Sequence, residues 1–244
     1  MDASNKFWLV LNFLPWTDWA ALAGYFAAWA GYAHFARQRA PIKPSLLATT
    51  NRIRRQWMLQ TSYRDVRILD GQVMQNLSTS PSFFASTTIL IIGGLLAALG
   101  TSDKASELVR EIPFAARTTA LVFDLKLLLM IAVFIYAFFR FTWSMRQYTF
   151  GALLIGAAPD AKQLDAMGEQ GAALREAFAD RAGRVVGLAA ETFNDGLRAY
   201  YFSFAAIGWF FSPAVFALGS AGVVWILYRR EFHSEVLAVL REQP

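Results

Sequence analysis

Two ionisable residues, Asp124 and Lys126, stand at the beginning of an apolar stretch that extends to Trp143. A charge inside a segment that crosses a lipid bilayer is costly, so such residues are functional candidates. Because they are two positions apart, their side chains do not share a helix face. Two interpretations stay open: a snorkelling Lys126 with a capping or interfacial Asp124, or a charge that lines an outer vestibule. Asp18, which opens another apolar stretch, is interpreted as a partner of the helix dipole rather than as an ion ligand.

Arginine-rich segments between the apolar stretches supply a second set of charges. The candidate network consists of Arg52, Arg55, Arg64, Arg67, Asp65, Asp70, Arg140, Arg146, Glu191 and Asp195. A solvated face against anionic lipid headgroups is the commoner use of such a basic cluster. The alternatives are an anion funnel and a network of buried salt bridges with Asp65 and Asp70. Glu191 and Asp195 are four residues apart and repel each other slightly, so we expect a cation beside them, an arginine rather than a bound ion.

Small residues follow one face of the second apolar stretch. This face consists of Ser78, Ser82, Ser86, Gly93, Ala97 and Gly100. Small faces let helices approach closely in lipid, and hydroxyl groups bond across helices, so packing within the bundle or between subunits is the favoured interpretation. The functional alternative is a pore wall, in which small side chains leave width and hydroxyl groups replace the hydration of an ion.

Several classes of chemistry find no support in the residues. There is no cysteine and there are only two histidines, so the sequence predicts no cysteine-based, transition-metal or haem site. Neither a GxxxxGK[ST] loop nor a GxSxG elbow occurs. We therefore predict no catalytic residue, no cofactor and no metal, and a protein that is not an enzyme. The formal charge of +5 indicates contact with anionic headgroups, because no nucleic-acid motif accompanies it.

The elements that must position these residues are long apolar helices. The chain is 56% hydrophobic and only 17% charged, with a mean hydropathy of +0.34. About 20 residues of helix cross the ~30 Å hydrocarbon core of a bilayer. The predicted fold is all-α: a single polytopic membrane domain over residues 1–244, with four transmembrane helices over 16–35, 82–101, 120–143 and 199–228. Pro81 is assigned to the first turn of the second span.

Two helical regions, residues 37–77 and 149–198, are predicted to extend the spans on the cytoplasmic side. The first is amphipathic from Asn51 onward, with a basic face opposite an apolar one. In the second, residues 149–158 are apolar but too few to cross a bilayer. A long helical pattern then follows Pro159 without a break into the fourth span, where Pro213 is expected to produce at most a kink.

Basic residues set the predicted orientation. The regions after the first and third spans hold fifteen lysines and arginines, and the opposite side holds seven, including Arg229, Arg230 and Arg241. The positive-inside rule places the fifteen in the cytoplasm, which puts both termini on the periplasmic side of a bacterial inner membrane. The first apolar stretch has no cleavage site after it, so we expect it to be retained rather than removed as a signal peptide.

Four blocks of sequence resemble the family known as domain of unknown function 599. They are Leu14–Asp18 with the Ala- and Trp-rich stretch that ends at Gly31–Tyr32, Arg54–Met58 with Arg64 and Arg67, Phe83–Thr88 running into Gly93–Leu96, and Tyr136–Tyr148. The resemblance covers nearly the whole chain, and the last two blocks are its most specific parts. It implies a membrane protein found in bacteria, and it brings neither a catalytic residue nor a substrate.

Two functions from different classes follow from these patterns. The leading expectation is a homo-oligomeric pore or small-ion transport protein, because four spans rarely enclose a path alone whereas a ring of subunits does. A second small face on the first span, Ala20, Gly24, Ala28 and Gly31, favours self-association. The alternative is a non-catalytic accessory or scaffold subunit that binds other membrane proteins. A lipid-modifying enzyme is a lower option, because it would need a cluster of acids or histidines that the sequence does not offer.

Overall fold

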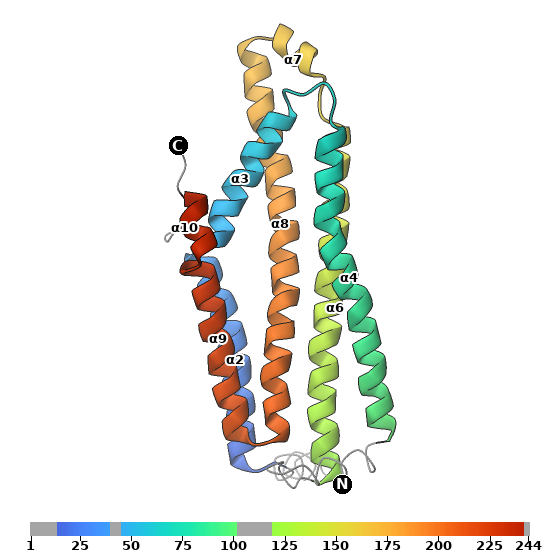
Figure 1. The fold of residues 1–244 in the computed structure, drawn as a ribbon, viewed down its shortest axis with the longest axis vertical. Coiled ribbons are helices and arrows are strands. Elements are labelled where there is room, and N and C mark those ends of the chain that lie inside the picture. Colours follow the sequence, from blue (N-terminus) through green and yellow to red (C-terminus); the bar gives the residue numbers. More distant parts are fainter. Residues whose placement is uncertain (1–13, 40–44, 102–118, 242–244) are drawn as a thin grey trace, which may run out of the picture. The chain divides into compact units, whose positions relative to one another are not determined.

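A computed structural model of the protein describes residues 14–39, 45–101 and 119–241 (Figure 1). In this part of the chain all regular structure is helical, which confirms the all-α prediction. The helices are α2 (Trp16–Arg39), α3 (Leu46–Thr61), α4 (Ile68–Gly100), α6 (Ala120–Gly156), α7 (Ala161–Ala166), α8 (Glu169–Ile207), the 3₁₀ turn η1 (Gly208–Phe210), α9 (Pro213–Phe232) and α10 (Glu235–Arg241).

The chain divides into two compact units, and the single membrane domain over residues 1–244 stays a prediction. The first unit consists of Met1–Arg39, Ile89–Tyr136 and Arg198–Arg229, and the second of Ala40–Thr88, Ala137–Leu197 and Arg230–Pro244. Helices α4, α6 and α8 each contribute one part to each unit.

Aromatic side chains form the core of the first unit. The fully buried ring of Tyr25 in α2 contacts Phe202 in α8 and Phe216 in α9, with ring centroids 5.4 and 4.9 Å apart. Trp29 stacks on Phe202 at 5.3 Å, and Trp209 stacks on Phe216 at the same distance. Large flat rings bury much apolar area and order their neighbours through preferred geometries, so these contacts tie α2, α8 and α9 together.

Small and flexible apolar residues form the core of the second unit. Its buried cluster consists of Met58, Met74, Tyr148, Ile155, Phe178, Ala179, Ala182, Val186 and Ala189. Two glycines of α8 bring α3 close: a Cβ atom on Gly183 would lie 2.8 Å from the Cα atom of Arg55, and one on Gly187 would lie 2.9 Å from Oδ1 of Asn51. The backbones of α3 and α8 can touch there because α8 has no side chain at those positions.

Helix α4 corrects the assignment of Pro81. The end of the amphipathic region, residues 68–77, joins the second apolar stretch in one helix over Ile68–Gly100, so Pro81 lies in the helix interior and not in a first turn. The earlier part of that region is a separate helix, α3, which ends at Thr61. Proline lacks an N–H group and its ring crowds the preceding turn, which bends a helix without ending it when packing compensates. Pro81 is buried, as are Met74 and Ala85 on the same side, so tertiary packing supports the continuous helix.

Residues 149–158 do not form a separate interfacial segment. Helix α6 continues to Gly156, and its last turns pack in the second unit, where Gly151 faces Met74 and Val186. The short apolar stretch is therefore the buried end of a longer helix, which the span-by-span reading of hydropathy did not reveal.

The chain turns back between α8 and α9, where a single fourth span over residues 199–228 was expected. Helix α8 ends at Ile207, and a new helix begins at Pro213 with the hydroxyl group of Ser212 accepting a hydrogen bond of 3.1 Å from the Val215 N–H group. Serine before and proline at the first position are signals of a helix start, so Pro213 begins a helix here and does not kink one.

The two helix segments on either side of this turn are antiparallel. Trp209 stacks on Phe216, the position of a Cβ on Gly208 is close to Val215, and that of a Cβ on Gly219 is 3.4 Å from the Cα atom of Ala205. Residues earlier in α8 thus face residues later in α9, as the side-by-side ribbons of the two helices in Figure 1 also show.

Two helices of the described part, α4 and α6, are long and apolar enough to cross a membrane by length and composition. The prediction of four spans is not confirmed and stays a prediction. Residues 1–13, 40–44, 102–118 and 242–244 lie outside the described residues, and so do the side chains of Arg37 and Arg39. The basic residues among them, which entered the orientation argument, are therefore known from the sequence alone.

Candidate functional site

A buried carboxylate at the start of α2 has a partner far away in the sequence. Asp18 is 8% exposed, and its Oδ1 atom accepts a hydrogen bond of 2.6 Å from Nε1 of Trp209. Pro15 precedes the helix, and its carbonyl group accepts the Asp18 N–H group at 3.0 Å, so the first turn holds the carboxylate in place. Asp18 thus holds Trp209, from another element of the first unit, in addition to the role of helix-dipole partner expected from its position.

Lys126 in α6 lies beside the same tryptophan. Its side chain is 2% exposed, and Nζ lies 5.6 Å from the ring centroid of Trp209 and 5.7 Å from that of Phe210. Both distances are within the ~6 Å over which an aromatic face attracts a cation. Burial disfavours the charged ammonium group, and the nearby Asp18 carboxylate offsets part of that cost electrostatically. The structure therefore encloses this ammonium group among aromatic rings instead of extending it to solvent.

Asp124 lies near Lys126 in the chain and has a different environment. Its side chain is half-buried, and its buried Oδ1 atom has no hydrogen-bond partner in the described part of the protein. We define the buried charge site as Asp18, Lys126 and Trp209. Asp124 lies in the same turn of α6 as Lys126, but it shows no contact with Asp18 or Trp209 in the described part of the protein.

The buried charge site pairs an acid with a base in aromatic surroundings. Such a pair can take up and release a proton, or hold a small ion against its oppositely charged member. Among residues 14–39, 45–101 and 119–241, no group of three or more His, Asp or Glu side chains is placed to hold a metal ion. The site's chemistry is therefore that of one ammonium and one carboxylate group.

Asp70 is the centre of a second buried cluster, in the second unit. It is fully buried, and its Oδ1 atom accepts hydrogen bonds from Trp57 Nε1 at 2.7 Å, Thr61 Oγ1 at 3.0 Å and Arg64 Nη1 at 2.5 Å. One oxygen thus connects α3, the turn that follows it and α4. The arginine pairs with a buried acid here, which is the salt-bridge alternative for Arg64 rather than the anion funnel.

Two other arginines hold loop carbonyl groups of the second unit. Arg67 donates to the carbonyl oxygens of Ala158 at 2.7 Å and Pro159 at 2.5 Å. Arg175 is 2% exposed, donates to the carbonyl oxygens of Ser62 and Ala161, and lies 4.1 Å from the Tyr63 ring. The planar guanidinium fork suits such multiple contacts. These two side chains therefore fasten loops between helices.

Arg140 and Asp195 form an ion pair between α6 and α8 in the second unit. The side chain of Asp195 is 6% exposed and that of Arg140 is 28% exposed. One turn further along α6, the fully buried Ser144 donates a hydrogen bond of 2.7 Å to the Ala189 carbonyl oxygen. Arg140, from α6, is thus the arginine expected beside Asp195.

Glu191 reaches an arginine through an intervening amide. Asn51 Nδ2 donates to Glu191 Oε1 at 3.2 Å, and Arg54 Nη1 donates to Asn51 Oδ1 at 2.7 Å. Burial lowers the pKa of Arg54 from its ordinary value, while the negative charge of Glu191 acts in the opposite direction. Arginine stays protonated at any physiological pH, so this chain of contacts is a permanent electrostatic link between α3 and α8.

The other predicted network members lie on the surface of the second unit. Arg55 binds Glu176 and Asp180, and these hydrogen bonds raise its pKa, first of all the bond to Asp180. Lys162 pairs with Asp65 at 3.8 Å, and both are exposed. Arg52 is exposed, and the exposed Arg146 lies 5.9 Å from the ring of Phe150 in its own helix. The structure does not bring the ten predicted members into one network.

The small face of α4 is largely open in the described chain. Ser86, Gly93, Ala97 and Gly100 are exposed, and no atom lies within 4 Å of the position that a Cβ would take on Gly93 or Gly100. The hydroxyl group of Ser78 donates to the Gln75 carbonyl oxygen of its own helix at 2.8 Å. The buried side of α4 is another one, with Asp70, Met74, Pro81, Ala85 and Thr88. Packing among the described residues therefore leaves most of this face open.

Sequence reasoning missed Trp209 as a member of the buried charge site and treated Asp18 and Lys126 separately. The three residues come from positions that no local pattern connects, and only the turn at residues 208–212 places the indole beside the carboxylate. A charge in each of two apolar stretches was the one available signal, because opposite charges in a low-dielectric interior stabilise each other.

A family model described as "Protein of unknown function, DUF599" matches residues 20–236. Neither the curated proteins nor the solved structures that were searched contain a match to this chain.

Proposed function

Because the chain belongs to the DUF599 family, whose description assigns no activity, we propose its function from the geometry. We propose a multi-pass protein of the bacterial inner membrane that self-associates and moves small ions across the bilayer, without catalysing a chemical transformation. The buried charge site carries this proposal. An enclosed ammonium group next to a carboxylate costs stability in an apolar helix bundle, and such groups persist in membrane proteins where ions or protons pass.

Membrane insertion is supported by α4 and α6, which have the required length and hydropathy. Both carry exposed large apolar side chains, including Phe83, Leu90 and Leu96 in α4 and Leu128 and Phe139 in α6. A water-soluble protein rarely exposes so many large apolar residues on long helices, whereas lipid tails solvate them. Anionic headgroups would attract the arginines of α3 and α8 at the membrane surface.

The turn at residues 208–212 supports five membrane segments in place of four. The segments would belong to α2, α4, α6, the end of α8 and α9. With an odd number of crossings, the N-terminus stays periplasmic and the C-terminus moves to the cytoplasm. Arg229, Arg230 and Arg241 then join the basic side, which removes the one feature of the sequence that opposed the positive-inside assignment.

Cysteine labelling tests this arrangement cleanly because the chain has no cysteine of its own. Single variants Thr101→Cys, Lys162→Cys and Arg241→Cys place a thiol at three exposed positions. With five segments, a membrane-impermeant maleimide added to intact spheroplasts labels Thr101→Cys alone, and all three after lysis. Labelling of Arg241→Cys in intact spheroplasts would restore the four-span arrangement.

Self-association is supported by two open small faces. Besides the face of α4, Ala20 and Gly24 of α2 are exposed, and no atom lies within 4 Å of a Cβ position on Gly24. Close helix approach between chains would satisfy both faces. The mass of the gently solubilised complex is the first test: a closed oligomer of three or more chains supports the pore, and a strict monomer contradicts it.

The same open faces favour a second candidate, a scaffold subunit that binds other membrane proteins. Ser86→Leu separates the two, because Ser86 is exposed in the centre of the α4 face. If the α4 face lines an ion path, Ser86→Leu changes the ion flux and leaves assembly of the oligomer nearly intact. If the protein is a scaffold, Ser86→Leu disrupts a complex of fixed stoichiometry, and the reconstituted protein carries no ion flux at all.

A further inference from the structure

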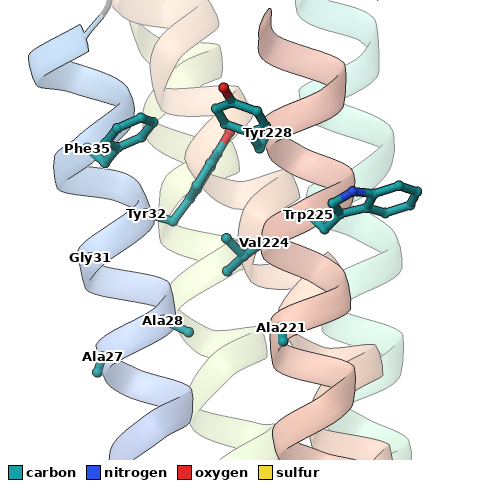
Figure 2. A pocket seen from close by; sticks show the side chains of 9 residues that line it. All are labelled: Ala27, Ala28, Gly31, Tyr32, Phe35, Ala221, Val224, Trp225 and Tyr228. Atoms are coloured by element: carbon teal, nitrogen blue, oxygen red, sulfur yellow. The ribbon is translucent and has the colours of Figure 1, made fainter. Parts of the chain in front are cut away.

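An apolar groove of about 620 Å³ runs between α2 and α9 in the first unit. Figure 2 shows its walls, which are Ala27, Ala28, Gly31, Tyr32 and Phe35 from α2 and Ala221, Val224, Trp225 and Tyr228 from α9. None of these side chains is charged, and the volume lies within the ~300–1,000 Å³ of known ligand sites. The groove is thus large enough for a ligand and suits an apolar one.

Small residues keep this groove open. Along one end of it the walls consist of Ala27, Ala28 and Ala221, and no atom lies within 4 Å of a Cβ position on Gly31 (Figure 2). The protein interior normally fills such space, because unfilled apolar volume forfeits dispersion contacts. An apolar occupant would restore those contacts.

Aromatic rings and one cation mark the other end of the groove. Phe35 and Tyr228 face each other across it, with centroids 6.3 Å apart, while the ring of Trp225 extends from α9 on the side away from α2 (Figure 2). The guanidinium group of Arg229, which is exposed and follows Tyr228 directly in α9, lies 5.2 Å from the centroid of the Trp225 ring. This contact holds a permanent positive charge at the outer side of Trp225.

We propose that this groove binds an acyl chain of one anionic phospholipid, with the headgroup phosphate on Arg229. The groove and its surroundings match the parts of such a lipid. The apolar channel suits the acyl chain, the aromatic rings are of the kind found at the level of lipid headgroups, and the guanidinium group suits a phosphate. Anionic lipids are concentrated in the cytoplasmic leaflet, which is where the five-segment arrangement puts Arg229. The inference rests on the proposed membrane insertion and not on ion movement.

A second copy of the chain fits the groove less well. Helices of two copies would meet at flat small faces, which the exposed surfaces around Gly24 and Gly93 already provide. A copy seated in the groove would also bring its own Arg229 into a symmetric contact, where the two like charges repel each other.

The test is native mass spectrometry of the full-length protein, released from detergent after incubation with phosphatidylglycerol or with phosphatidylcholine of the same acyl chains. The wild type is expected to retain one phosphatidylglycerol per chain at least about fivefold better than phosphatidylcholine. Both lipids carry a phosphate, but the choline group of phosphatidylcholine cancels its charge, so only phosphatidylglycerol offers Arg229 a net negative headgroup. Arg229→Gln is expected to remove this preference, and Arg241→Gln, on the exposed last residue of α10, to keep it.

A bulky side chain that fills the groove provides the second test. Gly31→Trp is expected to abolish retention of either lipid, whereas Ala30→Trp, at an exposed position of the same helix that does not line the groove, keeps retention unchanged. Both positions are exposed, so both variants are expected to fold, with unfolding temperatures close to that of the wild type.

Equal retention of the two lipids by the wild type would overturn the proposal, and so would lipid retention that Gly31→Trp leaves unchanged. Loss of oligomers rather than of lipid in Gly31→Trp would also overturn it, because that result would assign the groove to a second copy of the chain. Resistance to extraction by alkaline carbonate checks membrane insertion separately. A protein that is inserted but shows no lipid preference refutes the lipid site alone. A protein that alkaline carbonate extracts refutes the proposed function as well.

Discussion

The indole N–H group of Trp209 donates a 2.6 Å hydrogen bond to the carboxylate of Asp18, 191 positions earlier in the chain. Because Asp18 belongs to α2 and Trp209 to the turn between α8 and α9, this bond closes one end of the first unit. Lys126 from α6 lies over the same indole ring. Three elements thus meet at one tryptophan, which makes Trp209 the residue on which the buried charge site depends.

Trp209→Phe keeps an aromatic ring but removes the donor to Asp18. A buried acceptor without a partner costs about 1–3 kcal/mol, and more when it is charged, so we expect the free energy of unfolding in detergent to fall by at least this range. Trp143→Phe is the matched control, because Trp143 is 50% exposed, and we expect a change within about 0.5 kcal/mol. Equal effects of the two substitutions would contradict the role given to Trp209.

Lys126→Met removes a buried cation and keeps most of the apolar volume. Desolvation of an ammonium group is costly, so we expect the variant to be as stable as the wild type or more stable in thermal unfolding. Lys162→Met, at a side chain that is 84% exposed, should leave stability unchanged. A strong loss of stability in Lys126→Met alone would mean that the ammonium group is a structural partner of Asp18 and not a group retained for function.

Gly183→Ala tests the close approach of α3 to α8. The added Cβ would lie 2.8 Å from the Arg55 backbone, so one helix has to shift, and we expect a loss of about 1–3 kcal/mol in the free energy of unfolding. Gly71→Ala is the control, since nothing lies within 4 Å there, and alanine in an open helical position gains about 0.5–1 kcal/mol. A neutral Gly183→Ala would show that the two helices are further apart.

Arg140→Gln leaves the carboxylate of Asp195 nearly buried without its cation. Breaking a fully buried ion pair costs about 3–5 kcal/mol and breaking an exposed pair up to about 1 kcal/mol, so we expect an intermediate loss of roughly 2–3 kcal/mol. Arg146→Gln, six residues later and exposed, should cost little. Combining Arg140→Gln with Asp195→Asn should recover part of the loss, and a purely additive double variant would argue against the pair.

Hydropathy was sufficient to predict the helical class and helical structure over residues 16–35 and 120–143, because long apolar runs dominate there. It failed where a helix continues past a change in composition. The interior position of Pro81 depends on packing by Met74 and Ala85, and the reversal at Gly208–Ser212 depends on a short serine–proline start signal inside an apolar run. Both features are decided by tertiary contacts that a window of residues does not contain.

The candidate site was predictable only in part. Asp124 and Lys126 stand out because a charge in an apolar stretch is unusual, and the structure encloses Lys126. The pairing with Asp18 and Trp209 follows from how α2, α6 and the 208–212 turn come together, which no spacing encodes. Likewise the arginines divide into ion pairs, loop clamps and surface contacts according to neighbours from distant helices.

Ion flux into liposomes tests the central claim most directly. The reconstituted wild-type protein should carry a flux of small ions, read with a pH-sensitive dye and with a potential-sensitive dye. Lys126→Met should reduce this flux at least about tenfold, an effect of roughly 1.4 kcal/mol, while Lys162→Met retains it. Wild-type liposomes that behave like protein-free ones, or a flux that Lys126→Met leaves unchanged, would contradict the account.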